Sequence, residues 1–115
     1  MYGLVLEGGG AKGSYQIGAC RALYELGIEF GCVAGTSVGA LNGAMIVQGD
    51  IEKAYELWYN LNPSKVISLS SEENAGIGRI KKIVIERGLD ITPLARMVNE
   101  VVDEDRVRKS DMDFG

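Results

Sequence analysis

The stretch Gly35–Gly39, Gly-Thr-Ser-Val-Gly, constrains the fold of this chain more than any other. It follows a short apolar run, Cys32–Ala34, and precedes a helix-like run, Ala40–Val47. This strand–turn–helix context predicts a nucleophile elbow, in which Ser37 lies on a sharp turn with a strained backbone. Gly35 and Gly39 come so close together in such a turn that side chains there would clash. A tight turn with Ser37 as a helix cap is the simpler alternative.

A second glycine-rich stretch, Gly8-Gly9-Gly10-Ala11-Lys12-Gly13, follows an apolar run, Gly3–Leu6, that is typical of a buried strand. Glycines expose successive backbone N–H groups, and the N-terminus of a following helix adds partial positive charge that attracts an anion. The carboxyl ends of neighbouring parallel strands lie side by side, so we expect this loop to meet the elbow there. Together they would supply the nucleophile and the oxyanion donors that acyl transfer requires.

The sequence does not assign a general base to this site. The chain contains no histidine, which excludes a Ser-His-Asp triad within these residues. An aspartate becomes an effective base only when burial raises its pKa, and every aspartate here falls at an expected cap, loop or charged run. Lys12 is compatible with a Ser-Lys pair, with orienting the loop or holding an anion, and with an exposed loop side chain.

Hydrophobic spacing and glycine stops predict three further elements in the first 50 residues. They are a helix over 14–26 that stops at Gly27, a strand over 30–34 and a helix from 38 to near 49. This β–α–β–α order implies parallel strands joined by a right-handed crossover. The expected fold class is therefore α/β with a mainly parallel sheet.

Downstream, Asp50 is predicted to cap a helix whose apolar stripe packs in the core. The stripe comprises Ile51, Ala54, Tyr55, Trp58 and Leu61. We expect a short extended segment over 65–69, a surface loop over 68–78 that is a connector or a mobile cover for the site, and helices over 77–88 and from Thr92. The charged run 103–109 is expected to be solvated, and 111–115 resembles the lead-in to another strand. Two or three parallel strands leave apolar edges, so we expect a fragment of a larger domain or one completed by another chain.

Composition restricts the function classes. A chain of 115 residues with 46% apolar and 24% charged residues suits one ordinary globular domain at most. Its net charge of −4 argues against nucleic-acid binding and does not favour anionic membranes. Cys20 and Cys32 are expected to be small buried thiols in a reducing compartment. No signal peptide or apolar run of about 18 residues is recognisable, which favours a cytoplasmic location, and no cofactor or metal site is indicated.

These motifs resemble the N-terminal half of a patatin-like phospholipase domain. The resemblance rests on residues 4–13, 35–42 and 88–94 and extends over essentially the whole chain, 1–115. It implies a three-layer α/β/α domain, here apparently truncated, and a serine hydrolase that acts on lipid acyl esters through a Ser-Asp dyad. It also implies roles for single residues: Ser37 as nucleophile, Gly35 and Gly39 as the elbow glycines, and Gly8, Gly9, Gly10, Lys12 and Gly13 as the oxyanion loop.

The sequence departs from the family pattern at the base. The family aspartate lies in a downstream Asp-Gly-Gly or Asp-Gly-Ala motif, whereas this sequence has no Asp-Gly pair. We therefore expect half an active site and an almost inactive chain, in a parent protein that cleaves phospholipids or similar lipids. A transient membrane-surface contact and a homo-oligomer that covers the sheet edges are compatible with this interpretation.

Two other interpretations stay open at this point. Gly8-x-Gly10-x-x-Gly13 matches the dinucleotide-binding fingerprint, but that motif needs a carboxylate at the end of the second strand. Glu29 precedes that strand instead of ending it. The third interpretation is a fragment without catalytic activity.

Overall fold

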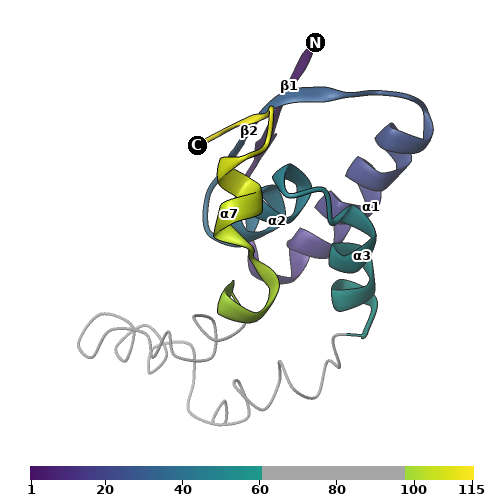
Figure 1. Cartoon of the computed structure of the whole chain (residues 1–115). Helices are drawn as coiled ribbons and strands as arrows, with labels where there is room; N and C mark the ends of the chain where they lie inside the picture. Colours follow the sequence, from purple (N-terminus) through teal and green to yellow (C-terminus); the bar gives the residue numbers. More distant parts are fainter. Residues whose placement is uncertain (61–97) are drawn as a thin grey trace, which may run out of the picture.

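The computed structural model describes residues 1–60 and 98–115, which form a three-stranded parallel sheet with helices packed against it (Figure 1). The strands are β1 (Tyr2–Leu6), β2 (Phe30–Gly35) and β3 (Asp113–Phe114), in the order β1-β2-β3. Leu6 lies opposite Gly35, so the carboxyl ends of β1 and β2 are level. The parallel α/β sheet predicted from the sequence is confirmed, including a strand in the segment 111–115.

The described helices all lie on one face of this sheet. They are η1 (Gly10–Lys12), α1 (Gly13–Glu25), α2 (Val38–Val47), α3 (Ile51–Asn60) and α7 (Glu104–Arg108). The strands follow one another across the sheet in the order β1, β2, β3. Right-handed crossovers between strands in such an order pass on the same side of the sheet. Helix α2 packs directly on the strands, and α1 and α3 pack on α2 and on each other.

The opposite face of the sheet carries exposed side chains in the described part of the chain. Val5, Cys32 and Ala34 alternate with the inward residues of β1 and β2 and are exposed. The prediction that Cys32 is buried is therefore wrong, because Val33 takes the helix-facing position next to it. Cys20, on α1, is buried as predicted.

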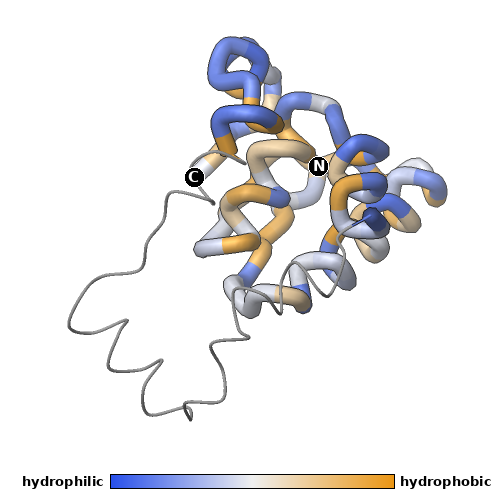
Figure 2. The backbone as a smooth tube through the Cα atoms, turned by 90° about the horizontal axis from the view of Figure 1, so that it is seen from below, coloured by the Kyte–Doolittle hydropathy of each residue, from blue (hydrophilic) through white to orange (hydrophobic). Residues whose placement is uncertain are grey.

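Helix α2 is buried on nearly all sides from Asn42 to Val47. The sheet covers one side, and α1 and α3 cover much of the rest. A β-carbon on Gly43 would lie 2.9 Å from the Phe114 ring, so a glycine allows α2 to lie close to the strands. In the tube of Figure 2, hydrophobic stretches run through the middle and the most hydrophilic ones lie toward the outside.

The segment 98–115 is fastened to the end of α2 by a polar cluster. Gln48, only 5% exposed, donates to the Val101 carbonyl at 2.8 Å and accepts from the Asp103 N–H at 2.9 Å. Arg106 donates to both carboxylate oxygens of Asp50, at 2.8 and 3.0 Å. The charged run 103–109 is largely exposed, as expected, but it also forms α7, with Asp103 as its cap.

Several expectations lie outside the described residues. They are the position of Leu61, the extended segment 65–69, the loop 68–78, the helix over 77–88 and the first part of the helix from Thr92. Residues 98–101, the described end of that last helix, are helical, and Val101 is buried. Tyr55 and Trp58 on α3 pack against the core, as predicted. Among the helices of the described ranges, none combines the length and the apolar character needed to span a bilayer.

The ion pair at the end of α2 makes stability depend on pH. Hydrogen bonds from Arg106 lower the pKa of the Asp50 carboxyl below its ordinary value, and Gln48 adds to this. Such a carboxyl stabilises the fold above its unfolded-state pKa, and this contribution is lost as the pH falls through the folded-state pKa. We expect Asp50→Asn to lower Tm at neutral pH and to reduce the fall of Tm below about pH 4. Thermal unfolding by circular dichroism checks this, and identical acid dependence in both proteins would contradict it.

Candidate active site

Ser37 lies in a strained turn between β2 and α2. Its φ of 56° and ψ of −125° make it the residue other than glycine with a positive φ in the described ranges. Such a conformation costs about 1–3 kcal/mol and persists where the surrounding structure enforces it. The Ser37 side chain makes no capping hydrogen bond to α2, and the residue is exposed. Ser37 therefore occupies the N-cap position of α2, as the simpler alternative has it, but its hydroxyl does not cap the helix.

The two elbow glycines are required by backbone contacts. A β-carbon on Gly35 would lie 2.5 Å from the Gly39 carbonyl carbon and 2.7 Å from the Ala40 nitrogen. A β-carbon on Gly39 would lie 2.7 Å from the Glu7 carbonyl oxygen, at the end of β1. Carbon atoms do not reach such distances without a shift of the backbone, so the elbow closes only with glycine at both positions.

The glycine-rich loop lies beside Ser37. A β-carbon on Gly8 would be 3.2 Å from the Ser37 β-carbon and 3.9 Å from its Oγ. Gly9 and Gly10 have φ values of 148° and 56°, which favour glycine. The backbone N–H groups of Gly8 and Gly9 donate to no residue in the described ranges. The structure thus places the glycine loop beside the serine, and the role of its N–H groups as oxyanion donors stays a prediction.

Lys12 and Gly13 occupy the end of this loop. Lys12 is exposed, and its side chain lies along Gly9, where a β-carbon would be 3.2 Å from its Cδ. Gly13 is buried at the start of α1, and a β-carbon there would lie 2.5 Å from the Trp58 ring. Gly13 therefore allows α1 to approach α2 and α3, and its assignment to the oxyanion loop stays a prediction.

The Ser37 hydroxyl forms no hydrogen bond to a possible base in the described ranges. No hydrogen bond joins Ser37 to a carboxylate there, and Asp50 is paired with Arg106 at the other end of α2. Burial raises the pKa of the Cys20 thiol, which makes it a poor nucleophile at neutral pH. The described residues therefore contain a candidate nucleophile and candidate donors, without a candidate base.

A buried polar network behind the loop was not foreseen from the sequence. Asn42, 1% exposed, donates to the Gly13 carbonyl and to Gln16 Oε1, both at 3.0 Å, and accepts from Trp58 Nε1 at 2.9 Å. Gln16 in turn donates to the Glu7 carbonyl at 2.6 Å. The signal in the sequence is an amide in the middle of an otherwise apolar helix, 38–47.

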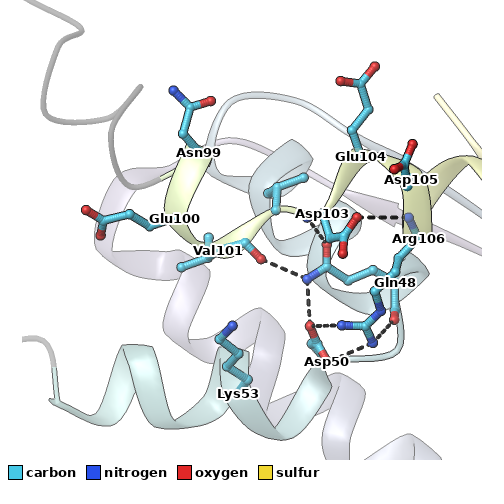
Figure 3. A pocket seen from close by; sticks show the side chains of 11 residues that line it. Gln48, Asp50, Lys53, Asn99, Glu100, Val101, Asp103, Glu104, Asp105 and Arg106 are labelled. Carbon is cyan, nitrogen blue, oxygen red and sulfur yellow. Dashed lines mark hydrogen bonds and ion pairs between the residues drawn. The ribbon is translucent and has the colours of Figure 1, made fainter.

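Two hollows lie at opposite ends of α2. One of about 330 Å³ lies beside the glycine loop and is lined by Val5, Leu6, Glu7, Lys12, Tyr15 and Gln16. The other, of about 530 Å³, is polar and surrounds Gln48, Lys53 and Arg106 (Figure 3). Helix α2 has 10 residues, so its two ends are about 15 Å apart, and the polar hollow lies at the end remote from Ser37.

Comparison with known proteins identifies the family. The model of the patatin-like phospholipase family matches residues 4–110, nearly the whole chain. The chain belongs to the patatin-like phospholipase family. The elbow and the glycine loop of this patatin-like chain both lie within the matched range. No solved structure matches the chain significantly.

The curated relatives are much longer proteins. The chain is 56% identical over 43 residues to lysophospholipase nte1 of Aspergillus terreus. This match covers 37% of this chain and 3% of that protein. It is 48% identical over 52 residues to patatin-like phospholipase domain-containing protein 7 of Rattus norvegicus, covering 45% of this chain and 4% of the relative. A Caenorhabditis elegans relative, patatin-like phospholipase domain-containing protein ZK370.4, is 42% identical over 62 residues. The match covers 50% of this chain and 5% of that protein.

The dinucleotide interpretation lacks structural support. It requires a carboxylate at the end of the second strand, and Gly35 occupies that position of β2. Glu29 precedes β2, which begins at Phe30.

The space around two glycines, one in the elbow and one on α1, predicts opposite effects of alanine on the stability of the protein. Gly39→Ala should destabilise the protein by about 1–3 kcal/mol, because the added methyl meets the end of β1. Gly18→Ala on α1 is the control: a β-carbon there meets nothing within 4 Å, and alanine favours a helix over glycine by up to about 1 kcal/mol. Urea unfolding measures both, and equal stability of the two variants would contradict the close contact.

Proposed function

We propose that this chain carries the nucleophile and the oxyanion donors of a hydrolase that cleaves lipid acyl esters. The observation that carries the proposal is the approach of Gly8 to Ser37, where a β-carbon would be 3.9 Å from Oγ. Two further observations support it: the Ser37 hydroxyl is exposed and does not cap α2, and the N–H groups of Gly8 and Gly9 have no acceptor in the described ranges.

The chemistry is acyl transfer through Ser37. Its Oγ bonds to the ester carbonyl carbon while the hydroxyl proton passes to a carboxylate base, and the loop N–H groups donate to the resulting oxyanion. The bond to the leaving alcohol then breaks as the base returns the proton to that alcohol. Water, deprotonated by the same base, attacks the acyl-Ser37 ester, releasing the fatty acid and restoring the serine.

The base of this proposal is an aspartate outside the 115 residues. The family resemblance implies an Asp-Gly-Gly or Asp-Gly-Ala motif, and the sequence contains no Asp-Gly pair. Residues 1–115 would then form the N-terminal part of a single patatin-like domain. In this proposal, the isolated 115-residue chain is a fragment without activity of its own.

The substrate that we propose is a phospholipid or a related lipid ester. The names of the relatives, which include lysophospholipase, support this class. The hollow beside the glycine loop also supports it, because Val5 and Tyr15 on its wall are 82% and 81% exposed and offer apolar surface to an acyl chain. A transient membrane-surface contact, a homo-oligomer and a cytoplasmic location stay predictions.

Replacing the serine tests the proposal directly. In the full-length gene product, Ser37→Ala should abolish labelling by a fluorophosphonate probe and hydrolysis of a lysophospholipid. Ser110→Ala is the matched control, because that hydroxyl accepts from the Met112 N–H in a different part of the fold, and both activities should persist. Peptide mapping that places the label on Ser14 or on any other residue would show that Ser37 is not the nucleophile.

The missing base is tested by comparing two lengths of the protein. The 115-residue chain should react with the probe at least about 100-fold more slowly than the full-length gene product, because a positioned base contributes a factor of this order. Circular dichroism of the short chain shows whether it is folded under the assay conditions. Equal rates in the two proteins would place the base within these 115 residues.

A further inference from the structure

Asn42 is a buried amide in a helix whose neighbouring side chains are apolar. It is 1% exposed, while the residues that follow it in α2, Gly43–Val47, are buried and apolar. A buried amide without partners destabilises the fold strongly, so such a residue is tolerated only with its hydrogen bonds satisfied. Both N–H groups and the oxygen of this amide have partners, and each partner lies on a different part of the chain from α2.

These partners attach α2 to both ends of the glycine loop. Nδ2 donates to the carbonyl of Gly13, where the loop enters α1. It also donates to Gln16 Oε1, and Gln16 Nε2 donates to the carbonyl of Glu7, where the loop leaves β1. One side chain on α2 thus holds the residue before the loop, through Gln16, and the last residue of the loop directly.

The same helix begins directly after Ser37, so these bonds relate the loop to the serine. The contact of Gly39 with the Leu6 and Glu7 carbonyls limits how closely the end of β1 can approach the elbow. The amide bonds limit how far the loop can move away. Together they define the position of the Gly8 and Gly9 N–H groups relative to Ser37 Oγ.

We propose that Asn42, acting through Gln16, is a positioning residue that holds the glycine-loop donors where the oxyanion develops. The inference rests on the proposed function and adds to it a residue that does not touch the substrate. A misplacement of about 1 Å can cost about 100-fold in rate, so a loosened loop reduces catalysis even when the fold remains.

Asn42→Asp is the principal test, because it keeps the shape and the acceptor for Trp58 but replaces both donors by oxygen. In the full-length gene product we expect kcat for a lysophospholipid to fall roughly 10- to 100-fold, with KM within about twofold, because the lost interaction acts on the transition state. The rate of fluorophosphonate labelling of Ser37 should fall by a similar factor.

Gln48→Glu is the matched control. It makes the same amide-to-carboxylate change in a buried residue of the same helical segment, but at the end remote from Ser37, where the amide donates to Asp50 and Val101. We expect it to lower Tm to a similar degree while kcat stays within about twofold, when both are measured well below the Tm values. Equal losses of kcat in the two variants would mean that Asn42 acts only through stability and would overturn the proposal.

Gln16→Glu provides a milder second variant if Asn42→Asp does not fold. Gln16 is only partly buried, and the change removes its donor to the Glu7 carbonyl while keeping the acceptor for Asn42. A lower kcat with unchanged KM supports the proposal, and unchanged kcat in this variant overturns it. Full activity of Ser37→Ala would instead refute the proposed function itself, so the two failures are distinguishable.

Discussion

The backbone contact between Gly39 and the end of β1 is the constraint on which the candidate site depends. The Leu6 and Glu7 carbonyls occupy the space that a side chain at position 39 would need, and the Thr36 N–H donates to the Leu6 carbonyl at 3.0 Å. This contact requires β1 and β2 to be parallel neighbours with level carboxyl ends. The pairing of β1 with β2 therefore brings the glycine loop and the serine together at one edge of the sheet.

Helix α2 connects the elbow to the rest of the described fold, because it packs on the strands and on the other helices. Apolar burial holds the helix between the sheet and its neighbouring helices, but this force has little directionality. Two buried amides supply the direction: Asn42 binds the glycine loop and α3, and Gln48, which follows the helix, binds the segment 98–115. Each amide loses its partners if the helix rotates or slides. Asn42 fixes the Ser37 end of α2 against the glycine loop, and Gln48 fixes the remote end against the segment 98–115.

The elements that could be predicted from the sequence are those that depend on local chemistry. The strand–turn–helix around Ser37 and the stop at Gly27, with φ of 79°, follow from residues close together in the chain. The burial of Cys32 was predicted wrongly, because the face of a strand that is covered depends on where the helices pack in three dimensions. The Arg106–Asp50 pair and the Asn42 network join residues far apart in sequence, and no local pattern reports such contacts.

The same distinction between local and distant contacts explains why a candidate nucleophile is recognisable here without a candidate base. Ser37 and the loop donors belong to two consecutive strand-to-helix turns, so both motifs fit within the first 40 residues. On the other side of the elbow, the Gly35 N–H donates to the Gly115 carbonyl, which extends the sheet beyond β2. The glycine loop occupies the β1 side of Ser37 in the described residues, so the base that we propose would lie on the β3 side or toward solvent. A residue that arrives there is brought by sheet topology, and neither of the two turn motifs constrains its place in the sequence.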